Sequence, residues 1–294
     1  MPKKEKAYSH EQLLRKAKRM RALMSIAPSM RVNPKKRVGI ELFLATGEGK
    51  IRVLAYNMAN SERLPLFINI HGSGFTIGSA EMDDPHMLNI AEKAGVKILS
   101  VDYSLAPEYP FPKALNECYA VLKYAKEHPD ELGIDPERIA VGGQSAGGNF
   151  TAAICLMECE RNQLGLKCAI LDYPPLDVYT DASEKPHPKG ALPVFLSRIF
   201  DPCYLNDKEA RKNPLVSPVF ADLETLRRFP PTLIITASRD SLCQEGEKFR
   251  DMLVSAGVDV THKRFEAVHG FNLKRGPAAN ESWQMIIDQL KLYI

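Results

Sequence analysis

The chain has 294 residues, of which 45% are hydrophobic and 26% are charged, and its formal net charge is +3. This composition is typical of one large globular α/β domain with a full core, and the net charge indicates no particular partner. No apolar run approaches the roughly 20 residues that span a bilayer, and no apolar segment follows the charged start, as a secretory signal requires. We therefore expect a cytoplasmic protein without a stable membrane anchor.

The first 37 residues are strongly basic, with twelve Lys or Arg against two Glu. Contact with an anionic surface is one interpretation, and the solvated face of a helix is the preferred one. No aromatic platform accompanies these charges, so we expect no nucleic acid partner. The six cysteines form no C-x-x-C pair and have no histidine at metal-ligand spacing. They predict buried, reduced thiols, and no metal or organic cofactor is implied.

A helix is predicted over 10–25, where Ser9 and Gln12 could form a capping box and apolar residues recur at helical spacing. The stretches 37–44 and 50–56 then predict an antiparallel hairpin at one edge of a sheet. From there, short apolar runs alternate with helical patterns. The predicted strands are 64–70, 96–101, 138–141, 166–171, 232–235 and 259–265, and the predicted helices are 85–94, 114–127, 146–161, 244–256 and 280–292. This alternation predicts an α/β fold with a mostly parallel sheet covered by helices on both faces.

About 60 residues interrupt the alternation between the strands ending near 171 and beginning at 232, and they are rich in proline and apolar side chains. Connections of this length are usually functional, so we interpret Tyr179–Ala221 as a helical cap over the carboxyl edge of the sheet. The predicted organisation is an N-terminal helical segment contributing to the cap (1–35), the first part of the core (36–178), the cap insertion (179–221) and the second part of the core (222–294).

The candidate chemistry centres on Ser145, in the sequence Gly143-Gln-Ser-Ala-Gly147 between a predicted strand and helix. This is the G-x-S-x-G nucleophile elbow, in which glycines two residues before and after the serine remove collisions with the neighbouring backbone. Asp240 and His269 follow later strands, in the chain order Ser, Asp, His. A carboxylate, an imidazole and a serine hydroxyl together can perform nucleophilic catalysis.

Each partner also has a structural interpretation, since Asp240 could cap the following helix and His269 could be a loop histidine bonded to backbone. Asp172, Asp177 and Glu245 are alternative acids, and Asp240 is preferred because it follows the strand after the cap. The turn His71-Gly-Ser-Gly-Phe75, which leaves a buried strand, stands where an oxyanion loop is expected.

The chain resembles the hormone-sensitive lipase-like family of α/β-hydrolases, which includes many bacterial carboxylesterases. The resemblance rests on segments from about residue 64 to the end, in the family's order: His71–Phe75, Asp102–Glu108, Gly143–Gly148, Asp172–Pro174, Asp240-x-Leu242 with Glu245-Gly246, and His269–Phe271. It implies an α/β-hydrolase fold with a cap, Ser145 as nucleophile, Asp240 as acid and His269 as base. It also implies that the backbone N–H groups of Ser73, Gly74 and Ala146 form the oxyanion hole.

Two residues depart from the family pattern. Ser73 stands where a glycine of the HGGG loop is usual, and Ser104 stands where arginine is usual. The first raises the question of whether the Ser73 hydroxyl is itself an oxyanion donor, and we expect that it is a bystander.

The sequence therefore predicts a serine carboxylesterase for short-chain acyl esters, a small-molecule substrate and an acyl-enzyme intermediate. An amidase, lactonase or sugar deacetylase with the same triad stays open, because the cap sets specificity. A non-catalytic receptor, such as the plant gibberellin receptors that the family resembles, is disfavoured because residue 269 is histidine. A homodimer is left open.

Overall fold

The computed structural model describes residues 8–24 and 37–294. Its core is one eight-stranded sheet in the order β1-β2-β4-β3-β5-β6-β7-β8. The β1–β2 and β2–β4 pairs are antiparallel and all other pairs are parallel, so the hairpin lies at one edge as predicted. The strands are β1 Ile40–Thr46, β2 Gly49–Tyr56, β3 Leu64–Ile70, β4 Lys97–Val101, β5 Ile134–Gln144, β6 Cys168–Asp172, β7 Thr232–Ala237 and β8 Val260–Phe265.

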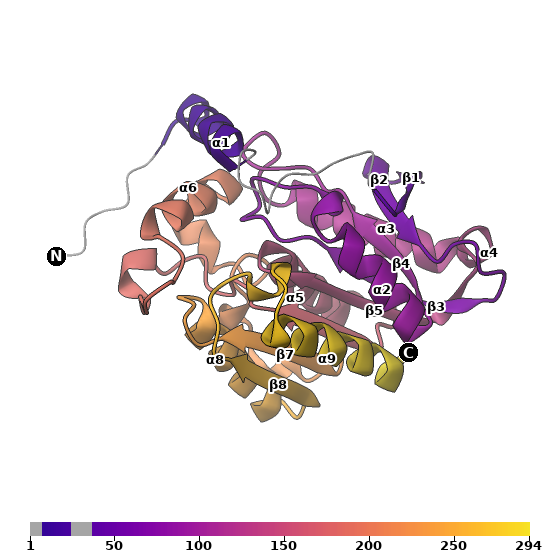
Figure 1. Ribbon diagram of the computed structural model, residues 1–294. Helices are drawn as coiled ribbons and strands as arrows, with labels where there is room; N and C mark the ends of the chain where they lie inside the picture. The colour runs from indigo at the N-terminus through magenta and orange to yellow at the C-terminus, as the bar shows by residue number, and fades with distance from the viewer. Residues whose placement is uncertain (1–7, 25–36) are drawn as a thin grey trace.

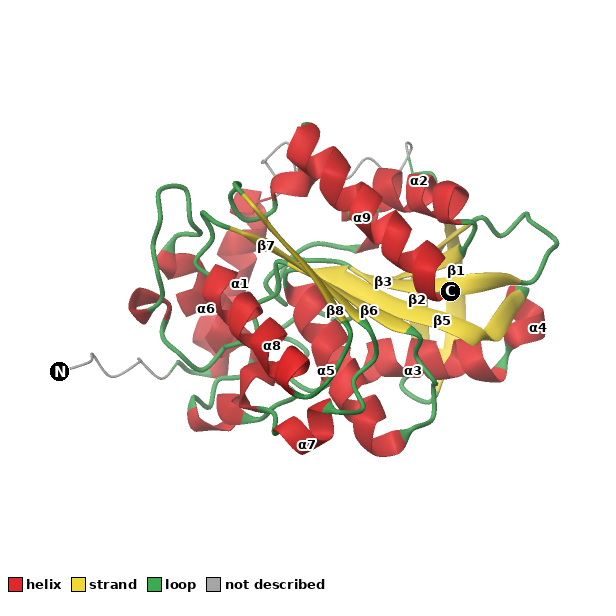
Figure 2. Cartoon of the chain, turned by 90° about the horizontal axis from the view of Figure 1, so that it is seen from below, coloured by secondary structure: helices red, strands yellow, loops and turns green. Residues whose placement is uncertain are grey.

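Helices cover both faces of the sheet (Figures 1 and 2). On one face α2 and α9 pack against each other and on the strands, and on the other face α3, α5 and α8 pack on the strands. The helices are α1 His10–Met24, α2 Asp84–Ala94, α3 Lys113–Glu127, α4 Pro129–Leu132, α5 Ala146–Arg161, α6 Val194–Tyr204, α7 Leu223–Leu226, α8 Cys243–Ser255 and α9 Pro277–Tyr293. Short 3₁₀ helices lie at η3 Ala80–Met82, η4 Ala182–Glu184, η5 Glu209–Lys212, η6 Pro218–Phe220 and η7 Phe271–Leu273.

The central strands are apolar because both of their faces are covered. In β3, six of seven residues are buried, and every residue of β4, β6 and β7 is buried. One hydrophobic cluster lies on the α3 and α5 face and a second lies on the α2 and α9 face. The six cysteines are buried and reduced, as the sequence predicts. No helix in the described part of the chain combines the length and the apolar composition that crossing a bilayer requires.

The N-terminal helix lies beside α6, the main helix of segment 179–221 (Figure 1). The predicted capping box is present, because Ser9 N donates to Gln12 Oε1 and Gln12 N donates to Ser9 Oγ, at 2.9 and 3.2 Å. The apolar stripe of α1 is buried and contacts Cys203 of α6. The parts of the predicted N-terminal segment at residues 1–7 and 25–35 lie outside the described residues.

Arg21 fastens α1 to two loops of the core. Its Nε donates to the carbonyl oxygen of Thr76 at 2.8 Å and its Nη2 donates to that of Ala106 at 2.9 Å. The guanidinium also forms two hydrogen bonds to the carboxylate of Glu108, at 2.6 and 2.7 Å. Thr76 belongs to the loop that follows β3, so α1 is joined directly to the predicted oxyanion loop.

Candidate active site

Ser145 lies on the sharp turn between β5 and α5, with φ of 50° and ψ of −119°. This is a strained conformation for a residue with a side chain, and a hydrogen bond from Ser145 N to the carbonyl oxygen of Asp172, at 2.8 Å, holds it. A Cβ added at Gly143 or at Gly147 would collide with the carbonyl oxygen of Ile70. The two glycines of the elbow are therefore required by close approach to β3.

His269 lies between Ser145 and Asp240. Its Nε2 is 3.0 Å from Ser145 Oγ, and its Nδ1 is 2.6 Å from Asp240 Oδ2. Asp240 is buried in the loop after β7, and its other oxygen accepts a hydrogen bond from Leu242 N at 3.1 Å. With the ring proton on Nδ1, the imidazole can accept the serine proton at Nε2 while the carboxylate stabilises the imidazolium. The structure thus brings together all three residues that the sequence selected.

The three alternative acids are engaged elsewhere. Asp172 Oδ2 accepts a hydrogen bond from Asn272 Nδ2 at 2.6 Å, and burial raises the pKa of its carboxyl well above the ordinary value. The Glu245 carboxylate accepts hydrogen bonds from Leu176 N at 2.7 Å and from Lys185 Nζ at 2.6 Å. The carboxylate of Asp177 accepts hydrogen bonds from Tyr179 N, from Thr180 N and from the Thr180 hydroxyl, all in its own loop. None of the three has a hydrogen bond to His269, which favours Asp240.

The loop after β3 passes close to the nucleophile. A Cβ added at Gly72 would lie 2.9 Å from the carbonyl oxygen of Gln144 and 3.2 Å from Ser145 Cβ. The backbone N–H groups of Ser73, Gly74 and Ala146 donate to no acceptor in residues 8–24 and 37–294. Ala146 N belongs to the first turn of α5, where N–H groups have no partner within the helix. Three free donors thus gather near Ser145, as an oxyanion hole requires.

Ser73 does not have a positive φ, whereas Gly74 has a φ of 56°. Ser73 therefore does not need the left-handed conformation that favours glycine, whereas Gly74 does. The Ser73 hydroxyl lies 3.0 Å from Tyr103 Oη, and Tyr103 Oη donates to the carbonyl oxygen of His71 at 3.0 Å. Because the phenol has one proton, the Ser73 hydroxyl must donate to it.

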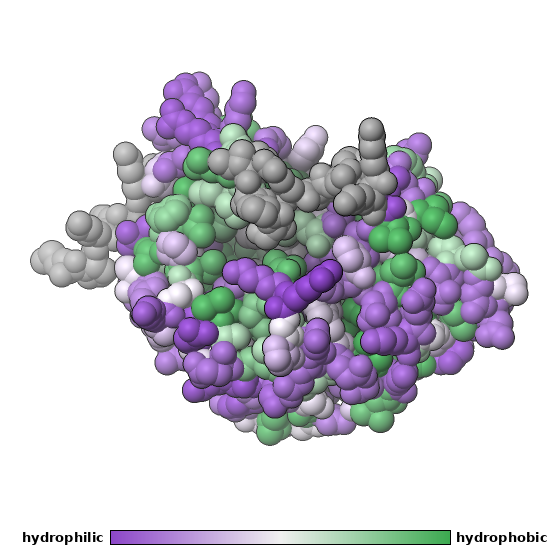
Figure 3. All heavy atoms as spheres, viewed as in Figure 1, coloured by the Kyte–Doolittle hydropathy of each residue, from purple (hydrophilic) through white to green (hydrophobic). Residues whose placement is uncertain are grey.

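Ser145 and His269 open into a cavity of about 170 Å³. Its wall is mainly apolar and includes Met24 of α1 together with Leu196 and Phe200 of α6. Phe200 lies directly over Gly74, because a Cβ added there would collide with its ring. Figure 3 shows apolar side chains gathered around α6 on this face of the molecule. Among the described residues no three His, Cys, Asp or Glu are grouped as a metal site would require.

Comparison with known proteins agrees with this geometry. Residues 67–273 match the model of a family described as alpha/beta hydrolase fold. The chain belongs to the α/β-hydrolase family. The family match is of the hormone-sensitive lipase-like type. A stretch of 91 residues is 46% identical to the hormone-sensitive lipase of Mus musculus, which is 31% of this chain and 12% of that protein.

Two curated relatives of this α/β-hydrolase are similar over longer stretches. An arylesterase of Saccharolobus solfataricus is 34% identical over 212 residues, which are 70% of this chain and 68% of that protein. The carboxylesterase NlhH of Mycobacterium tuberculosis is 33% identical over 218 residues, which are 71% of this chain and 67% of that protein. Among solved structures, an esterase of Pyrobaculum calidifontis superposes with a TM-score of 0.84 at 30% identity, over 94% of this chain and 92% of that one.

Several residues around the site of this α/β-hydrolase were not singled out from the sequence. Phe200 was only one of many apolar residues of the predicted cap, and Tyr103 was part of a matching segment without a role. Asp83 lines the same cavity as Ser145, and its position before the predicted helix 85–94 gave no signal of this. These residues reach the site through contacts between distant segments, which leave no local pattern.

Proposed function

We propose that this α/β-hydrolase is a serine carboxylesterase that hydrolyses short-chain acyl esters through a Ser145 acyl-enzyme. That the chain is a carboxylic ester hydrolase follows from its relatives and structural neighbours, which are arylesterases, carboxylesterases and esterases. The finer proposal rests on one observation, the continuous hydrogen-bonded line from Asp240 through His269 to Ser145, with distances of 2.6 and 3.0 Å.

In the proposed reaction His269 Nε2 accepts the Ser145 proton as Oγ attacks the ester carbonyl carbon. The carbonyl oxygen becomes an oxyanion and accepts hydrogen bonds from the N–H groups of Ser73, Gly74 and Ala146. The imidazolium then gives its proton to the leaving alkoxide, so the carbon–oxygen bond breaks and the acyl-enzyme forms. Water, deprotonated by His269, attacks the acyl carbon, and the acid leaves as Ser145 regains its proton.

The shape of the cavity supports short acyl groups. Segment 179–221 and α1 are proposed to act together as the cap, because both contribute side chains to the cavity wall. Leu196 and Phe200 of α6 line this cavity, and the Phe200 ring lies against Gly74 of the loop after β3. A preference for roughly two to six acyl carbons is proposed, since binding energy in an apolar pocket grows with buried area only while the chain still fits.

The test is a panel of p-nitrophenyl esters of increasing acyl length, run beside acetylated sugars, lactones and amides. We expect the highest kcat/KM for acyl chains of two to six carbons. The variant Ser145→Ala should lose on the order of 10⁶ in kcat while remaining folded. A maximum at twelve or more carbons contradicts the short-chain proposal, and a preference for the amides or sugar acetates favours the corresponding alternative.

A further inference from the structure

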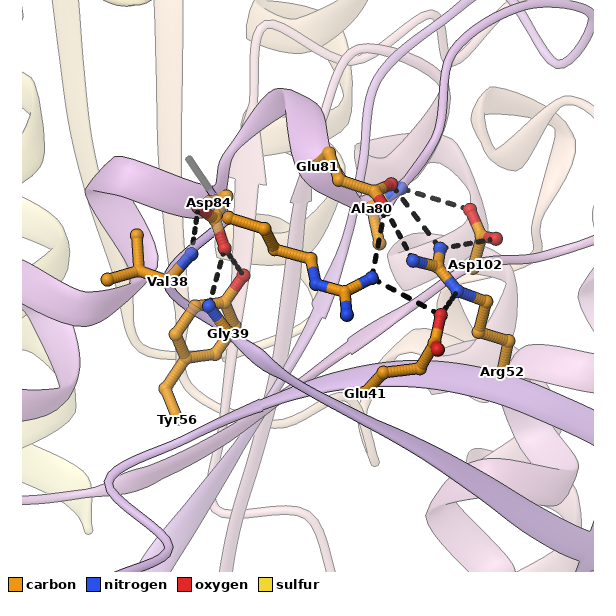
Figure 4. A network of polar contacts seen from close by, with 10 residues as sticks. Val38, Gly39, Glu41, Arg52, Tyr56, Ala80, Glu81, Asp84 and Asp102 are labelled. Carbon is orange, nitrogen blue, oxygen red and sulfur yellow. Dashed lines mark hydrogen bonds and ion pairs between the residues drawn. The ribbon is translucent and has the colours of Figure 1, made fainter. Parts of the chain in front are cut away.

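Two adjacent aspartates at the start of α2 are bonded very differently. Asp84 accepts three hydrogen bonds, from Val38 N and Gly39 N at 2.8 Å each and from Tyr56 Oη at 2.9 Å (Figure 4). Asp83 accepts one side-chain hydrogen bond, from Asn69 Nδ2 to its Oδ2 at 3.2 Å. Its Oδ1 has no hydrogen-bond partner within the described ranges. The carboxylate of Asp84 is therefore satisfied and that of Asp83 is not.

Helix capping does not explain Asp83. It stands at the N-cap of α2, where an aspartate usually accepts a hydrogen bond from the first turn, yet its side chain makes no such bond. It is 1% exposed and forms no ion pair with any described Lys or Arg. Burial raises the pKa of its carboxyl to about 6, with the Asn69 hydrogen bond acting in the opposite direction. A buried carboxylate without a cation is costly, and no cation among the described residues offsets that cost at Asp83.

The catalytic cavity is where a partner can reach Asp83. Asp83 belongs to the wall of the cavity that also exposes Ser145 and His269. Several nearby polar atoms, such as Asn69 Oδ1 and Asp172 Oδ1, are sealed from solvent and without a partner. Asp83 Oδ1 is not one of these sealed atoms, and Asp83 belongs to the cavity lining. The other acid that we compare with it, Asp177, lines the same cavity but accepts three hydrogen bonds from Tyr179 and Thr180.

Residues that precede and follow Asp83 in the chain are held by polar contacts, as Figure 4 shows for Ala80, Glu81 and Asp84. On one side Ala80 N donates to Asp102 Oδ1 at 3.1 Å, and Glu81 is hydrogen-bonded to Arg52 of β2. On the other side Asp84 is fixed by its three bonds to the backbone of residues 38–39 and to Tyr56. Asp83 is thus presented to the cavity from a fixed position, which lowers the entropy lost when a ligand binds.

We propose that Asp83 forms a subsite in the catalytic cavity for a positively polarised group of the ester, either an ammonium or a hydroxyl. This inference rests on the proposed function and names its substrate class: small esters that carry such a group beside the reacting carbonyl. The carboxylate accepts a hydrogen bond from the hydroxyl or attracts the ammonium, and the apolar wall receives the rest of the molecule.

The test compares pairs of esters of equal size. Acetylcholine and 3,3-dimethylbutyl acetate differ in a positive charge, and the p-nitrophenyl esters of 3-hydroxybutyrate and 3-methylbutyrate differ in a hydroxyl. We expect the ratio of kcat/KM within at least one pair to favour the charged or hydroxylated ester. The variant Asp83→Asn should lower that ratio by about tenfold or more, the usual effect of losing a charge-assisted contact. The control Glu62→Gln, at an exposed carboxylate that does not line the cavity, should change the ratio less than about twofold.

A binding measurement separates the subsite from catalysis. Calorimetric titration of the Ser145→Ala variant with choline and with 3,3-dimethylbutanol should show tighter binding of choline, and Asp83→Asn in that background should abolish the preference. Asp83→Ser, which is smaller and neutral, repeats the comparison if the asparagine variant fails to fold. Unchanged ratios in both ester pairs, with no preference in calorimetry, overturn the subsite. Failure of the wild-type chain to hydrolyse p-nitrophenyl acetate instead contradicts the proposed function and leaves the calorimetric result to decide on Asp83.

Discussion

The hydroxyl of Ser73 donates its proton to Tyr103 Oη, 3.0 Å away, and so is directed into the protein rather than at the substrate. The departure from glycine at this position therefore adds a support for the oxyanion loop and no additional oxyanion donor.

We predict that Ser73→Ala and Ser73→Gly keep kcat within about tenfold of the parent, a change of under roughly 1.4 kcal/mol in the barrier. The backbone N–H remains in both variants, and only the bond to Tyr103 is lost. Steady-state kinetics with p-nitrophenyl acetate measures this. A hundredfold loss of kcat in Ser73→Ala, with KM and Tm unchanged, would show that the hydroxyl is a true donor.

Asp240→Asn should lower kcat by roughly 10⁴ without unfolding the protein, because an amide beside Nδ1 favours the wrong tautomer of His269. Asp177→Asn is the matched control, since that carboxylate lines the cavity and its hydrogen bonds to described residues all lie within its own loop. The test is to measure kcat for both variants after confirming that their Tm values are equal. A larger loss in the Asp177 variant means that the acid has been misassigned.

Phe200→Ala should move the acyl-length optimum to longer chains, because the ring that lies over Gly74 closes the cavity at that point. Phe195→Ala on the same helix is the control. Phe195 is 59% exposed and does not line the cavity, so the optimum should stay in place. The ester panel gives the answer directly. An unchanged optimum in the Phe200 variant would place the limit on acyl length elsewhere in the wall.

Gly147→Ala should destabilise the fold severely, by several kcal/mol, because its Cβ would collide with the carbonyl oxygen of Ile70 in a region that cannot relax. Gly47→Ala is the control, since a Cβ there meets nothing within 4 Å. Urea unfolding monitored by circular dichroism measures both. Equal midpoints for the two variants would contradict the close approach of β3 and α5.

The Glu81–Arg52 pair predicts a defined pH dependence of stability. Burial is the largest single influence and would raise the pKa of the Glu81 carboxyl, but hydrogen bonds from Arg52, from Ser79 and from its own backbone N–H, with the charge of Arg52, together lower the pKa to about 2 from 4.5. The unfolded chain therefore takes up this proton first as the pH falls. The contribution of the pair is present above pH 4.5 and is lost as the pH falls through about 2.

Glu81→Gln should accordingly reduce the free energy of unfolding by about 1 kcal/mol at pH 7, since solvent partly screens the pair. The difference from wild type should shrink between pH 4.5 and 2. Glu62→Gln, at an exposed carboxylate, should show no such dependence. A difference between the Glu81 variant and wild type that stays constant down to pH 2 would refute the assignment.

Much of the fold follows from local patterns. The strand at 64–70 and the helix at 146–161 are predicted to the residue, because apolar runs and glycine turns mark their ends clearly. The strand predicted at 138–141 was too short, since β5 begins at Ile134. Its first residues, Asp135, Pro136 and Glu137, carry no strand pattern, and the register against β3 shifts there. Tertiary pairing overrides local propensity at this point.

The positions of Ser145, Asp240 and His269 were predictable for a related reason. Each follows a strand of a mostly parallel sheet, and the carboxyl ends of such strands meet at one edge. Asp83 could not be distinguished from Asp84, because their different surroundings come from residues 38–39, 56 and 69, which are distant in the sequence.

The contacts of Arg21 connect entry of the substrate to the chemistry. The same guanidinium that fastens α1 over the cavity also holds the carbonyl oxygen of Thr76, whose own N–H donates to Ser73 O at 3.3 Å. If α1 moves away to admit an ester, the oxyanion loop loses the hydrogen bond from Arg21 to the carbonyl oxygen of Thr76. An open molecule would then be a poor catalyst, and only reclosure over the ester would restore the donors' alignment. Removing the first helix should consequently slow the chemical step as well as open the cavity.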